Sequence, residues 1–76
     1  MSERREIPIR GEMIRLGQLL KLADYVDSGG EARDLLEQED VLVNGERETR
    51  RGRQLHPGDL VTVTDAVLEI VPIDTP

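Results

Sequence analysis

The most informative part of this sequence is residues 16–60, whose centre reads Gly29-Gly30-Glu31-Ala32-Arg33, then Val41-Leu42-Val43-Asn44-Gly45-Glu46, then Arg50-Arg51-Gly52-Arg53. The pair Asn44-Gly45 is the strongest short signal for a β-hairpin, because a type I′ turn needs positive φ at both central residues. Residues 41–43 and 46–49 are then the two strands of the hairpin. A second turn is expected at Pro57-Gly58.

The apolar residues before the hairpin have helical spacing. In residues 16–26 they recur at intervals of three and four, which places them on one stripe of a helix; they are Leu16, Leu19, Leu20, Ala23 and Val26. The segment Asp27-Ser28-Gly29-Gly30 interrupts this pattern, and Ser28 or a glycine can cap a second helix over residues 31–38. Helices this short are not stable alone, so both must pack on an apolar surface.

That surface is expected to be a sheet. Residues 60–64 and 67–71 supply two further strands, and residues 6–10 fit an edge strand, where Pro8 is tolerated because an edge can lack one N–H donor. The sequence therefore predicts an α+β fold, a helical hairpin packed on a small antiparallel β-sheet. The 76 residues form a single domain, 1–76, with residues 1–5 and 73–76 as flexible tails. The core should include Leu19, Leu20, Leu35, Leu36, Val43 and Val61.

Charge is distributed unevenly along the chain. A net charge of −6 argues against generic nucleic-acid binding. However, residues 24–40 hold seven acidic residues and one basic residue, while the remainder holds nine of each, so the whole excess lies in that window. Arg47, Arg50, Arg51 and Arg53 then follow within seven positions. The sequence thus predicts an acidic second helix next to a basic loop.

Composition excludes several classes of protein. There is no cysteine, so disulfides and thiolate metal sites are excluded. No apolar run has the length of a signal peptide or approaches the ~20 residues that span a bilayer. We expect a soluble cytoplasmic protein that does not contact membranes.

No convincing catalytic group of residues is present. Ser28, His56 and Asp59 are the residue types of a hydrolase triad, but no nucleophile motif accompanies them, and His56 before Pro57-Gly58 fits an exposed turn. The acids at 34, 37 and 39 lack the spacing of a calcium-binding loop. We therefore expect no enzymatic activity, no metal, no cofactor and no small-molecule substrate.

The arginine run offers a different chemistry. Arg50-Arg51-Gly52-Arg53 follows a tight hairpin, and arginine presents a planar fork of donors that suits phosphate. The alternative is a solvated loop whose arginines pair with Glu46 and Glu48. Composition alone does not separate these two interpretations.

Five motifs at defined distances, over about residues 14–64, resemble a known family. They are Leu16-Gly17-Gln18-Leu19-Leu20-Lys21, Ser28-Gly29-Gly30-Glu31-Ala32-Arg33, Val41-Leu42-Val43-Asn44-Gly45-Glu46, Glu48-Thr49-Arg50-Arg51-Gly52-Arg53 and Pro57-Gly58-Asp59. Together they are similar to the RNA-binding domain named after ribosomal small-subunit protein four, the S4 domain, and above all to small stand-alone bacterial proteins built from it. The resemblance implies a helical hairpin (the αL motif, a helix-turn-helix unit) on a small sheet, with RNA lying across the helices and the hairpin.

The resemblance also implies which residues bind RNA. Lys21 and Arg33 match basic helix positions, and Asn44-Gly45 matches the hairpin turn. The full set of expected RNA-binding residues is Arg15, Lys21, Arg33, Asn44, Arg47, Arg50, Arg51 and Arg53.

The expected function is non-catalytic binding of structured RNA, ribosomal or transfer RNA, by a ribosome-associated monomer. The alternative is a protein-interaction adaptor, in which the acidic face of the second helix meets a basic partner such as a ribosomal protein.

Overall fold

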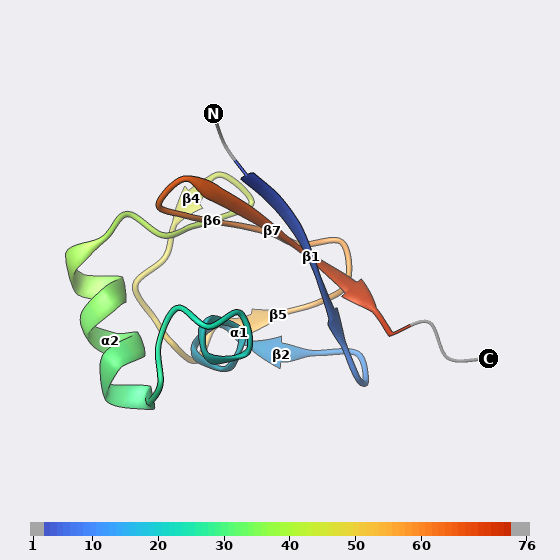
Figure 1. Ribbon diagram of the computed structural model, residues 1–76, viewed down its shortest axis with the longest axis horizontal. Coiled ribbons are helices and arrows are strands. Elements are labelled where there is room, and N and C mark those ends of the chain that lie inside the picture. The colour runs from blue at the N-terminus through green and yellow to red at the C-terminus, as the bar shows by residue number, and fades with distance from the viewer. Residues whose placement is uncertain (1–2, 74–76) are drawn as a thin grey trace.

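The computed structural model describes residues 3–73, and it consists of a five-stranded sheet with two helices on one of its faces (Figure 1). The fold is α+β, as the sequence predicts. A separate two-stranded sheet lies beside the first helix (Figure 1). The elements in chain order are β1 Glu3–Ile9, β2 Ile14–Arg15, α1 Leu16–Leu22, α2 Gly29–Gln38, β3 Leu42–Val43, β4 Glu46–Arg47, β5 Gln54–Leu55, β6 Leu60–Val63 and β7 Ala66–Pro72.

The β3–β4 hairpin has the predicted turn. Asn44 has a φ of 52° and Gly45 a φ of 86°, so both central residues are left-handed, as a type I′ turn requires. The antiparallel register places Val43 opposite Glu46. Strand β3 also pairs with β6, and β6 with β7.

Gly45 and Gly30 form a matched pair for testing this turn. A Cβ on Gly45 would meet nothing within 4 Å, so Gly45→Ala should lower the free energy of unfolding by about 1–2 kcal/mol through backbone strain alone. Gly30 lies in the first turn of α2 without positive φ, so Gly30→Ala should raise the free energy of unfolding by about 0.5–1 kcal/mol. Urea denaturation of both variants measures this, and equal effects would contradict the assigned turn.

The sheet is mixed rather than antiparallel. Strand β1 pairs in parallel with β7, which is possible because the rest of the chain forms the long crossover that parallel strands need. The strand begins at Glu3, so residues 3–5 belong to the sheet and not to a tail, and Pro8 lies on the expected edge. Ile73 N–H donates to the Ile9 carbonyl at 3.0 Å. The predicted tail residues 1–2 and 74–76 lie outside the described part of the chain.

Helix α1 ends earlier than its apolar stripe suggests. The stripe continues to residue 26, but the helix ends at Leu22 and Asp24 takes a φ of 67°. Tyr25 N–H donates to Leu20 O at 2.9 Å and Asp24 N–H to Lys21 O at 3.1 Å, which is the Schellman pattern of a helix C-terminus. Val26 is buried all the same, because the turn brings it back to the core.

Helix α2 begins at Gly29, two residues before the predicted start. The Ser28 hydroxyl accepts the Glu31 N–H at 3.2 Å, and the Glu31 carboxylate accepts the Asp27 N–H at 3.0 Å. Ser28 is therefore the N-cap, and these two bonds satisfy N–H groups that a helix start otherwise leaves unpaired.

The core lies between the helices and the sheet. Five of the six expected core residues are buried within it, namely Leu19, Leu20, Leu36, Val43 and Val61. Leu35 is only half-buried and packs against the edge of this cluster, because Ala32 and Leu36 form the stripe of α2 that faces the sheet. None of the helices in residues 3–73 is long and apolar enough to cross a membrane.

Candidate nucleic-acid interface

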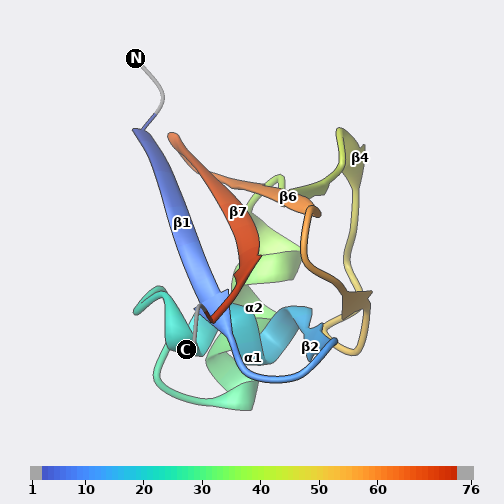
Figure 2. The ribbon, with the colours of Figure 1, turned by 90° about the vertical axis from the view of Figure 1, so that its right-hand side faces the viewer.

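Residues 48–53, called the arginine loop below, connect β4 to β5 and attach to the start of α1 (Figure 2). The attachment includes the β2–β5 pair, which joins Ile14 to Leu55 and Arg15 to Gln54. Two residues per strand give no alternating pattern, so the sequence analysis missed this pair. The first N–H groups of α1 complete the contact, since Leu16 donates to Arg53 O at 2.9 Å and Gly17 to Arg51 O at 2.8 Å.

Gly17 permits this close approach. A Cβ at this position would lie 3.3 Å from the Arg51 Cβ and 3.4 Å from the Arg51 carbonyl oxygen. The first distance is tighter than ordinary van der Waals contact, and the second lies at its lower limit. A glycine in the first turn of a helix destabilises the helix. Here the glycine leaves room for two carbonyl groups of the arginine loop to accept the N–H groups at the start of α1.

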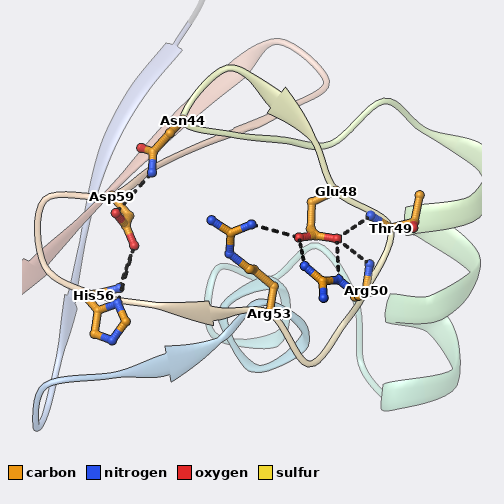
Figure 3. A network of polar contacts seen from close by, with 7 residues as sticks. All are labelled: Asn44, Glu48, Thr49, Arg50, Arg53, His56 and Asp59. Atoms are coloured by element: carbon orange, nitrogen blue, oxygen red, sulfur yellow. Dashed lines mark hydrogen bonds and ion pairs between the residues drawn. The ribbon is translucent and has the colours of Figure 1, made fainter.

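Glu48 organises the arginine loop from inside. Its side chain is 8% exposed, and the loop folds around the carboxylate (Figure 3). Oε2 accepts the Thr49 and Arg50 backbone N–H groups, each at 3.0 Å, and Arg50 Nε at 3.2 Å. Oε1 accepts Arg50 Nη2 at 3.2 Å and Arg53 Nη1 at 3.0 Å. Five donors therefore converge on one buried carboxylate.

These contacts change the acidity of the pair. Hydrogen bonds from the Arg50 side chain and backbone, with a further bond from Arg53, lower the pKa of Glu48 to about 2. The same contact raises the pKa of Arg50. Glu48 is therefore ionised at any physiological pH, and the loop keeps its shape.

A first concave surface, the helix-side hollow, lies where the loop meets both helices. It has a volume of about 240 Å³ and is lined by Arg15, Gly17, Gln18, Lys21, Gly29, Arg51 and Gly52. The Arg51 guanidinium donates to the Gly29 carbonyl at 3.2 Å, and that of Arg15 donates to the Gly52 carbonyl at 3.2 Å. The Lys21 ammonium group has no hydrogen-bond or ion-pair partner among residues 3–73. Three cations thus face one hollow that contains no carboxylate.

A second concave surface, the loop-side hollow, lies on the other side of Gly52. It has a volume of about 700 Å³ and is lined by Arg50, Gly52, Arg53, Gln54, His56 and Asp59. Because Gly52 lines both hollows, the two form one continuous surface. The structure therefore brings together Arg15, Lys21, Arg50, Arg51 and Arg53, which the sequence placed in three separate segments.

The other three predicted site residues make structural contacts elsewhere. Arg33 pairs with Glu37 at 3.4 Å, and Arg47 pairs with Asp40 at 3.5 Å. Neither arginine lines a hollow. Their partners, Glu37 and Asp40, belong to the acidic segment 24–40 and neutralise the charge of two predicted RNA-binding arginines. The Asn44 side chain connects the hairpin turn to the start of β6. Its Nδ2 donates to Asp59 Oδ1 at 3.2 Å, and its Oδ1 accepts the Leu60 N–H at 2.9 Å.

Two residues of this surface were underestimated from the sequence. The sequence places Glu48 in the predicted strand 46–49, in the Glu48–Arg53 motif and as a possible partner of the arginines in a solvated loop, and none of these interpretations predicts its burial. His56 was interpreted as a turn residue. It is in a turn, because its N–H donates to Asp59 Oδ2 at 2.8 Å, yet its ring also lines the loop-side hollow.

Comparison with known proteins adds independent information. The S4 domain matches residues 7–71. A Bacillus subtilis (strain 168) protein named "Probable ribosome maturation protein RlbA" is 54% identical over 57 residues, which is 75% of this chain and 80% of the relative. Heat Shock Protein 15 of Vibrio cholerae, solved as a trimer, has a similar fold, with a TM-score of 0.65 and 24% identity over 83% of this chain and 67% of that chain. The chain therefore belongs to the S4 domain family.

Proposed function

We propose that this protein binds structured RNA without catalysis, through the surface formed by the two hollows. The observation that carries the proposal is the gathering of Arg15, Lys21 and Arg51 around the helix-side hollow, which contains no carboxylate. The phosphate backbone supplies most of the affinity of such complexes, and basic side chains supply the contacts.

The basic side chains have different tasks in this proposal. Lys21, whose ammonium group has no protein partner among residues 3–73, acts as a point charge for a phosphate. Arg15 and Arg51 each use Nη1 to hold a backbone carbonyl, which fixes the guanidinium while its other donors point to the ligand. Because these groups are held before RNA arrives, little side-chain entropy is lost on binding.

The proposed RNA is ribosomal, bound during maturation of the ribosome in the cytoplasm. The name of the Bacillus subtilis relative, a probable ribosome maturation protein, supports this choice over transfer RNA, since that protein is 54% identical over 57 residues. The proposed binding unit is the monomer, because both hollows are built within one chain.

The adaptor alternative has less support. An acidic docking face needs free carboxylates, but Glu37 on α2 and Asp40 just after it are paired with Arg33 and Arg47. A basic protein partner would have to displace these arginines or bind through the remaining exposed acids Asp34 and Glu39.

Removal of two charges from the helix-side hollow tests the proposal. Lys21→Gln combined with Arg51→Gln should weaken binding to ribosomal RNA and reduce the slope of log affinity against log salt by about 1.4–1.8, since each phosphate contact contributes about 0.7–0.9. Affinity is measured by fluorescence anisotropy at several salt concentrations. Arg50 and Arg53 are left intact, because their replacement would leave the buried Glu48 unpaired.

The matched control is Arg4→Gln with Arg10→Gln. It removes the same charge from exposed residues of the β1 segment, neither of which lines the two hollows. This control should leave the slope unchanged. Equal losses in the two double variants would mean that RNA responds only to net charge, and an unaffected Lys21/Arg51 variant would favour the adaptor alternative.

A further inference from the structure

We propose that the loop-side hollow holds one unpaired nucleotide of the RNA, with its base stacked on the His56 ring. The inference rests on the proposed function and goes further, because it names the feature of the RNA that this surface selects: a bulged or looped nucleotide rather than a continuous duplex.

The His56 ring is available and held in position. Its side chain is 58% exposed, while its backbone is fixed by the N–H bond to Asp59 Oδ2 and by Pro57 after it. The chain has no Phe or Trp, and its one Tyr, Tyr25, is half-buried against the core. His56 is therefore the one ring that residues 3–73 offer to a ligand beside the arginines. Proteins stack unpaired RNA bases on such rings, histidine included.

The arginines beside His56 can hold the phosphate of the same nucleotide. Arg53 and His56 lie at the two ends of β5, with Arg50 close to Arg53 (Figure 3). Glu48 occupies Nε and Nη2 of Arg50 and Nη1 of Arg53. The other guanidinium nitrogens of these two residues have no partner among residues 3–73, and each is a donor suited to phosphate.

Asp59 makes the two ends of the loop-side hollow electrostatically different. Its side chain is 25% exposed and lies beside His56, where its negative charge disfavours a phosphate. The phosphate is therefore placed at the Arg50 and Arg53 end and the base at the His56 end. The amide of Gln54, on the same lining, can hydrogen-bond a base edge.

The volume of the loop-side hollow is large enough for one nucleotide. Its volume of about 700 Å³ falls within the ~300–1,000 Å³ of small-ligand sites. Bases inside an A-form helix are already stacked on their neighbours and cannot reach a side-chain ring, whereas bulged or looped bases can be splayed out. A stacked base on His56 therefore requires an unpaired nucleotide.

The test compares a blunt RNA duplex, in which every base is paired, with the same duplex carrying one unpaired adenosine at its centre. The wild-type protein should bind the bulged duplex more tightly by roughly 5- to 150-fold, the range expected for one base–ring stack. His56→Ala should abolish this preference, because it should weaken binding to the bulged duplex far more than binding to the blunt duplex. His56→Phe, which keeps a ring, should retain the preference. Thermal melting of each variant confirms that the fold is intact.

Lys21→Gln separates this inference from the proposed function. It lies in the helix-side hollow and should weaken binding to both duplexes by the same factor. If the wild type binds the two duplexes equally, or if His56→Ala weakens both equally, the nucleotide site is wrong while RNA binding stands. If the wild type binds neither RNA, both proposals are overturned.

Discussion

Replacing Leu36 by alanine should lower the free energy of unfolding by about 2–5 kcal/mol, which is the range measured when a buried leucine is truncated to alanine. Leu36 is fully buried between α2 and the sheet. The core is small and contains no Phe or Trp, so neighbouring side chains have little freedom to fill the cavity. Small domains have about 5–15 kcal/mol of stability in all, so this change would remove a large share.

Leu22→Ala is the matched control for that variant. Leu22 is the same residue type in a helix, but it is 56% exposed, so its truncation should change stability by no more than about 0.5 kcal/mol. Urea denaturation monitored by circular dichroism measures both. Comparable losses for the two leucines would show that α2 does not pack on the sheet as described.

Replacing Glu48 by glutamine should lower the free energy of unfolding by about 1–3 kcal/mol at neutral pH, the cost of leaving buried hydrogen-bond partners unsatisfied. The neutral amide can accept fewer bonds than the carboxylate, which now receives five. The cost stays below the ~3–5 kcal/mol of a fully buried broken pair, because Arg50 and Arg53 reach water, which screens their charges.

The pH dependence of stability tests the same pair. The pKa of Glu48 is lowered from 4.5 to about 2 in the folded protein, so its carboxylate stabilises the fold fully above pH 4.5 and loses that contribution as pH falls towards 2. The difference in stability between the wild type and Glu48→Gln should therefore shrink over that interval. Denaturation at pH 7, 5, 4 and 3 measures it, and a difference independent of pH would mean that Glu48 is not the titrating group. Glu46→Gln, on an exposed residue of β4, is the control and should have little effect at any of these values.

The local features of the fold could be predicted from the sequence where a short motif dictates backbone conformation. Asn44-Gly45 encodes left-handed φ at both positions, so the hairpin could be predicted. Ser28 has the side chain of an N-cap and was one of the predicted caps of α2, although the helix begins two residues before the predicted start. The end of α1 could not be predicted, because the apolar stripe continues through Ala23 and Val26 although the backbone has already left the helix. Periodicity reports which side chains are buried and not how the backbone brings them there.

The site could be predicted only in part. The sequence indicated eight basic or turn residues, and the structure gathers five of them around two hollows. The pairing of Arg33 with Glu37, four residues later on the same helix, could have been recognised from the sequence. The pairing of Arg47 with Asp40 depends on how the chain folds between α2 and β4, and it could not. RNA binding by the gathered residues is the proposal made above, together with the salt-dependence experiment that tests it.

The sequence by itself determined the α+β class, the β3–β4 hairpin, the cap of α2 and most of the core, because these follow from local conformational preference and from the spacing of apolar side chains. Tertiary structure alone decided that β1 runs parallel to β7, that Leu36 rather than Leu35 faces the sheet, and that Glu48 is buried among arginines. Each of these depends on contacts between residues distant in sequence or on the orientation of a helix. The free-energy cost of burying the Glu48 carboxylate is offset only when five donors converge on it. No pattern of neighbouring residues specifies that convergence.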